Sequence, residues 1–126
     1  MSAVILTEDE LRAKCAEWQK ILRLQDWIIS VGIFRERDMK GENRCGEVEW
    51  TLEKRMASIR ILDPVDYPDG LMEEQDMELT LVHELLHLHL AAVTPDHEDE
   101  LRHCAMEQAI DAISRGLVQL KRCNTQ

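Results

Sequence analysis

The residues with the clearest chemical potential are the five letters HELLH at positions 83–87. Residues four apart on an α-helix lie about 40° apart around the axis and about 6 Å apart along it, so His83 and His87 would project from one face and could share a tetrahedral metal ion. Glu84 is turned by about 100° from His83 and would lie beside the ion without binding it. Its carboxylate could then take a proton from a metal-bound water. The spacing predicts a zinc site for hydrolysis, with Glu84 as the catalytic group.

A catalytic zinc ion normally has three protein ligands and one open position, so a third ligand must come from another segment. The expected source is segment 97–120, a predicted helix with a polar stripe at spacings of three or four: Glu100, His103, Glu107, Asp111 and Ser114. His103 and Glu107 lie one turn apart, and either would suit zinc, so spacing alone does not choose between them. We favour Glu107, because its neighbours Cys104 and Ile110 place it nearer the buried side.

Hydrophobic periodicity predicts the elements that must position these residues. Thr7 and Glu10 form a capping-box signature before the first helix, and the short connection 53–56 favours an antiparallel hairpin between the second and third strands. The expected elements are helices at 8–23, 74–92 and 97–120 and strands at 27–34, 47–52 and 57–62. The resulting order, α-β-β-β-α-α, predicts an α+β fold with a three-stranded, mainly antiparallel sheet. The zinc site would lie between the last two helices.

The bulk properties limit the classes of partner. A length of 126 residues fits one domain, 1–126. The formal charge of −10 argues against a nucleic-acid partner, because such binding depends on clustered Lys and Arg. No apolar run reaches the roughly 20 residues needed to span a membrane, and the first residues lack the features of a signal peptide. The four cysteines form no CxxC pair and are expected to be reduced thiols. We therefore expect a cytoplasmic protein.

The segment TLVHELLH, followed by a Glu on the next helix, resembles the gluzincin clan of zinc metallopeptidases, and the α-β-β-β-α-α order resembles its minimal, zincin-like members. The resemblance implies that His83, His87 and Glu107 bind zinc and that Glu84 is the general base. Several gluzincins place an Asp four residues after the ligand Glu to hydrogen-bond the first His, which implies that role for Asp111. The short single-domain zincins of phages and prophages are similar too. They imply a small regulator that cleaves one host or phage target.

Two histidines depart from the family pattern. His89 stands where an apolar residue is usual, and we expect it to be a partly exposed helix residue. His103 competes with Glu107 as the third ligand. A residue that stabilises the transition state cannot be assigned from spacing. The candidates by residue type are Tyr67, His97 and His103.

The expected function is hydrolysis of a peptide or protein by a zinc-bound water, in a cleft bounded by an edge strand to which an extended peptide could add. The leading alternative is a zinc-binding adaptor or inhibitor that keeps the scaffold but has little turnover. A hydrolase acting on a non-peptide amide is a third class, since the same activated water would serve it.

Overall fold

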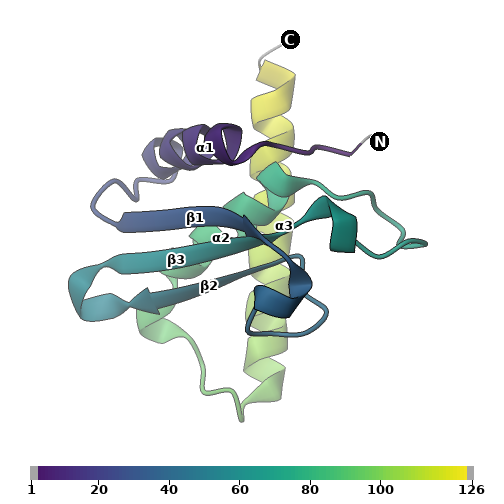
Figure 1. Cartoon of the computed structure of the whole chain (residues 1–126). Coiled ribbons are helices and arrows are strands. Elements are labelled where there is room, and N and C mark those ends of the chain that lie inside the picture. The colour runs from purple at the N-terminus through teal and green to yellow at the C-terminus, as the bar shows by residue number, and fades with distance from the viewer. Residues whose placement is uncertain (1–2, 125–126) are drawn as a thin grey trace.

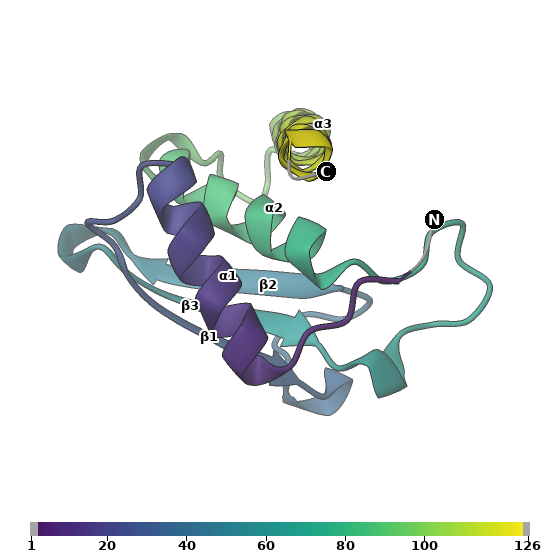
Figure 2. The same ribbon diagram turned by 90° about the horizontal axis from the view of Figure 1, so that it is seen from above.

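The computed structural model describes residues 3–124, so the first two and last two residues of the predicted domain 1–126 lie outside this range. Its main elements are α1 (Glu8–Ile21), β1 (Ile28–Phe34), β2 (Gly46–Thr51), β3 (Met56–Leu62), α2 (Met77–His89) and α3 (Glu100–Asn124). This order confirms the predicted α+β fold, and Figure 1 shows its course. Figure 2 shows α1 and α2 on one face of the sheet, with α3 lying over α2 on the side away from the strands.

The sheet is mixed, with strand order β1-β3-β2. β2 and β3 pair antiparallel, as the short connection between them predicted, whereas β1 pairs parallel to β3. The sheet therefore differs from the mainly antiparallel one expected. The reason is that β3 takes the central position, where Ala57, Ile59 and Ile61 are buried, while the segment 35–45 carries the chain from β1 past this position to the far edge.

α1 begins at the predicted capping box, in which the Thr7 hydroxyl accepts from the Glu10 amide and the Glu10 side chain accepts from the Thr7 amide. Its predicted apolar stripe is buried, including Leu11, Cys15 and Trp18. Burial raises the pKa of the Cys15 thiol to about 11, so Cys15 is an unreactive core residue.

α2 is buried on the side that faces the sheet and α1, where Met77, Leu81 and Leu85 have no exposed surface. Asp76 caps its first turn by accepting from the Leu79 amide. No helix within residues 3–124 has the length and apolar character needed to cross a membrane.

α3 is attached mainly through polar contacts. Only Ile110, Ser114 and Val118 are buried among its described residues. Near its C-terminal end, the Arg122 guanidinium donates to both oxygens of Asp76 at 2.8 and 3.0 Å. Both apolar packing and side-chain charges therefore position α3.

Gly46 lies at the start of β2, where α2 comes closest. A Cβ at this position would lie 2.5 Å from Cγ2 of Thr80 and 3.5 Å from Cγ of Glu84. The Thr80 methyl cannot easily move, since β-branched side chains on helices have restricted χ1 angles. The absence of a side chain at Gly46 therefore sets the spacing between β2 and α2.

We predict that Gly46→Ala lowers the free energy of unfolding by about 1–3 kcal/mol, as expected for overpacking. Gly116→Ala is the matched control, because a Cβ at Gly116 would meet no described atom within 4 Å and alanine favours a helix by up to about 1 kcal/mol. Urea unfolding of both variants measures the two effects. Equal stability of Gly46→Ala and the unmodified protein would contradict the close approach.

Candidate metal centre

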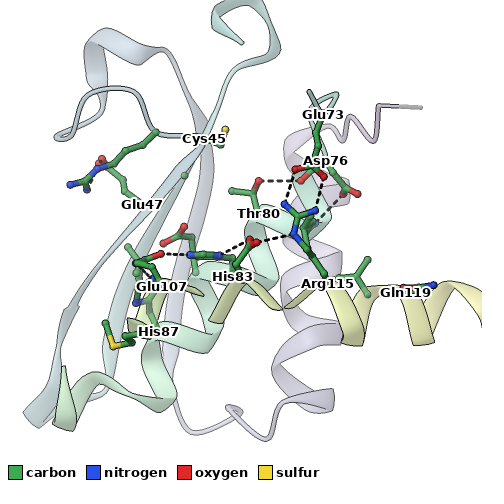
Figure 3. Close-up of a pocket in the computed structure, with 18 of the residues that line it drawn as sticks. Cys45, Glu47, Glu73, Asp76, Thr80, His83, His87, Glu107, Arg115 and Gln119 are labelled. Carbon is green, nitrogen blue, oxygen red and sulfur yellow. Dashed lines mark hydrogen bonds and ion pairs between the residues drawn. The ribbon is translucent and has the colours of Figure 1, made fainter. Parts of the chain in front are cut away.

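His83 and His87 on α2 converge on Glu107 of α3. Nε2 of His83 lies 2.9 Å from Oε2 of Glu107, and Nε2 of His87 lies 2.9 Å from Oε1 of the same carboxylate. One ligand atom from each of the three residues falls within 4.8 Å of the other two. The group lies between α2 and α3, as predicted, and Figure 3 shows the three side chains together in the cleft.

This donor set fits a zinc ion. Two imidazole nitrogens and one carboxylate oxygen are ligands that zinc prefers, and bonds of about 2.1 Å in a tetrahedron place ligand atoms roughly 3.4 Å apart. The spacing within the group is compatible with that figure after small side-chain movements. Burial lowers the pKa of His87, although the negative charge of Glu107 acts in the opposite direction. Low pKa favours the neutral imidazole, which is the form that binds metals.

Glu84 is buried at the floor of the same cleft, with 7% of its surface exposed. Burial, together with the charges of Glu107 and Glu47, raises its pKa to about 8, while Arg44 acts in the opposite direction. Burial and the neighbouring carboxylates thus favour the neutral form of Glu84 in the metal-free protein. A divalent cation bound nearby would lower the pKa, because an opposite charge favours the carboxylate.

Asp111 lies on the other side of His83, with Oδ1 3.6 Å from Nδ1 of the imidazole. Its second oxygen, Oδ2, accepts from Nε of Arg115 at 2.8 Å. The same guanidinium donates to both oxygens of Glu73 at 2.6 and 2.7 Å. Sequence reasoning missed Arg115 and Glu73. The spacing of Asp111 and Arg115 is a recognisable i,i+4 charge pair, but Glu73 is 42 residues from Arg115 and no local pattern joins them.

The cleft around the group has a volume of about 1240 Å³. Strand β2 forms one wall and α3 the other, while α2 forms the floor and the segment 67–76 lies at one end. The segment 39–45 at the rim is held by Glu47, which is buried and accepts from the amides of Lys40 and Gly41. The alternating pattern of β2 gave no sign that Glu47 would be buried.

The remaining histidines and the tyrosine lie outside the ligand group. His103 lines the cleft but lies outside the ligand group, and its Nε2 atom is buried without a hydrogen-bond partner within the described chain. Tyr67 also lines the cleft, and its hydroxyl donates to the carbonyl of Glu73. His97 is exposed on a loop that does not line the cleft. His89 is exposed, as expected, and its Nε2 donates to the Leu22 carbonyl at the end of α1.

No family model, curated protein or solved structure matches the chain. The structure itself shows the α-β-β-β-α-α order and a possible metal-ligand group formed by His83, His87 and Glu107.

We predict about one tightly bound zinc ion per chain. His83→Ala, His87→Ala and Glu107→Ala should each abolish tight binding by removing one of three converging ligands, whereas His103→Ala should retain it. Elemental analysis and competition with a chromophoric chelator measure the stoichiometry and the affinity. Loss of tight binding in His103→Ala, with Glu107→Ala unaffected, would instead indicate a three-histidine site.

The pKa of Glu84 also predicts a pH-dependent stability of the metal-free protein. A raised pKa in the folded state favours folding below the ordinary value of 4.5, and this contribution is lost as the pH rises towards about 8. Glu84→Gln lacks this titration. Its free energy of unfolding, relative to the unmodified protein, should therefore increase between about pH 4.5 and pH 8. Urea unfolding with a chelator present would show this, and a pH-independent difference would contradict it.

Proposed function

We propose that this protein is a zinc-dependent hydrolase, and specifically a metallopeptidase of the gluzincin type. The observation that carries the proposal is the buried Glu84 carboxyl group in the same cleft as the converging ligands His83, His87 and Glu107. A metal site that only stabilised the fold would be closed by a fourth protein ligand and would not need an adjacent acid. Here the three ligands leave one position for water or substrate.

The proposed roles follow from the positions of the side chains. When bound, zinc would lower the pKa of its water to about 7 and polarise a substrate carbonyl. Glu84 would accept the proton as the water attacks and pass it to the leaving amine. Asp111 would hold His83 in the tautomer that leaves Nε2 free to bind the metal. Oδ1 of Asp111 lies 3.6 Å from Nδ1 of His83, which is outside hydrogen-bond range but places the carboxylate beside that nitrogen.

The shape of the cleft supports a peptide substrate. Among residues 3–124, β2 pairs only with β3, so its other edge is available along the cleft wall. An extended peptide could pair with this edge through backbone hydrogen bonds and bring a scissile carbonyl to the site between β2 and α3. The free thiols at Cys15, Cys45, Cys104 and Cys123 suit action in a reducing cytoplasm.

We predict that Glu84→Gln keeps zinc and fold but loses at least 100-fold in the rate of hydrolysis, because the amide preserves the shape and removes the basic oxygen. Zinc-loaded protein would be incubated with denatured casein and with a cell lysate, and new N-termini would be identified by mass spectrometry. Glu98→Gln, on the exposed loop before α3, is the matched control and should cleave normally.

Turnover by Glu84→Gln equal to that of the unmodified protein would remove Glu84 from this role. Tight zinc binding without cleavage of any protein would overturn the peptidase proposal and favour an adaptor or inhibitor, or a hydrolase of non-peptide amides.

A further inference from the structure

Arg115 occupies a junction between the metal centre and the end of the cleft. It lies one helical turn after Asp111 on α3 and donates through Nε to Asp111, while its two terminal nitrogens form a fork on Glu73. All five N–H groups of a guanidinium are fixed in one plane, so these contacts place both carboxylates relative to each other. Figure 3 shows Arg115 between Glu73 and the histidine group.

The Asp111 side chain needs such a partner. It is 44% exposed, so packing alone does not fix the rotation of its carboxylate. With Oδ2 engaged by Arg115, Oδ1 is left facing Nδ1 of His83. An imidazole that carries its proton on Nδ1 has a free lone pair on Nε2. In His83, Nε2 is the nitrogen on the side of the ligand group. Arg115 therefore holds Asp111 with one carboxylate oxygen 3.6 Å from Nδ1 of His83, where its charge favours a proton on that nitrogen.

The Glu73 side connects this arrangement to the substrate cleft. Arg115 lowers the pKa of Glu73, so the pair is ionised at neutral pH. The Glu73 carbonyl accepts from the Tyr67 hydroxyl at 2.9 Å, and both residues line the cleft. The Arg115 guanidinium thus contacts Glu73, at one end of the cleft, and Asp111, which lies beside the ligand His83.

We propose that Arg115 is a positioning residue of the metal centre, which sets Asp111 against His83 and ties that setting to segment 67–76 through Glu73. The inference rests on the proposed zinc site and adds a residue to it. Arg115 lines the cleft, and its hydrogen bonds go to Asp111 and Glu73, not to His83, His87 or Glu107. Its effect on zinc is transmitted through Asp111.

Arg122 provides a matched comparison two turns further along α3. It also forms a fork on a carboxylate near the start of α2, that of Asp76, and so joins α3 to the same region of the chain. Asp76 caps α2 by accepting from the Leu79 amide, and no hydrogen bond or ion pair joins it to His83 within residues 3–124. Arg115→Gln and Arg122→Gln therefore both remove a link between α3 and the segment that leads into α2, through Glu73 and Asp76 respectively, but only the first removes the partner of Asp111.

The test is zinc affinity measured by chelator competition, together with the visible absorption spectrum of the cobalt-substituted protein. We expect Arg115→Gln to bind zinc about 10-fold more weakly or worse, as typical for loss of a group that orients a ligand, and to change the cobalt spectrum. Arg122→Gln should match the unmodified protein in both measurements. Equal affinities for Arg115→Gln and the unmodified protein, or equal losses in the two arginine variants, would overturn the proposal.

A double-mutant cycle separates positioning from general stabilisation. Asp111→Asn should weaken zinc binding, and adding Arg115→Gln should cause no further loss, because both changes interrupt the same path. Additive losses would show that Arg115 acts independently of Asp111 and would overturn the proposal. If Arg115→Gln does not fold, Arg115→Lys keeps the charge without the fork and should still weaken zinc binding. Failure of the unmodified protein to bind zinc would instead overturn the proposed function.

Discussion

The carboxylate of Glu107 lies 2.9 Å from both His83 and His87, so the candidate ligands themselves join α3 to α2. α3 has 25 residues and three buried side chains among those described, so this polar contact adds to a limited apolar interface. The candidate ligands therefore form part of the tertiary structure. An ion that bound the folded chain and not the unfolded one would stabilise it by mass action, and the docking of α3 and the binding of metal would then be coupled.

Without a metal ion, the burial of Glu84 close to Glu107 is electrostatically unfavourable. Glu84 is buried close enough to Glu107 for their charges to interact, which together with burial raises the pKa of Glu84. Burying an acid in this way is unfavourable when it must ionise. A divalent cation between the ligands would offset the charge of Glu107 and favour the carboxylate form of Glu84. The unfavourable burial of Glu84 in the metal-free protein and its proposed role as a base in the zinc-bound protein therefore have the same physical origin. Both follow from the position of its carboxyl group close to Glu107.

Much of the fold could be predicted because its signals are local. The capping box at Thr7, the apolar stripe of α1 and the pairing of β2 with β3 each depend on residues close in sequence. The common face of His83 and His87 follows from helical periodicity. Non-local pairings could not be found in this way. Examples are the parallel pairing of β1 with β3 and the contact of Arg115 with Glu73, which join residues far apart in sequence with no repeating pattern between them. The helix ends also differed from the predicted ones by a few residues.

Two small residues determine how closely the walls of the cleft approach its floor. Gly46 lets β2 approach Thr80 and Glu84 on α2, where even a methyl group would meet side-chain atoms. Ser114 is fully buried on the face of α3 that packs toward α2, and its hydroxyl is satisfied by the Ile110 carbonyl within the same helix. Larger side chains at these positions would move the walls outward, and ligands that must converge to a few ångströms tolerate little displacement. The geometry of the metal centre thus depends on residues that have no chemical role in it.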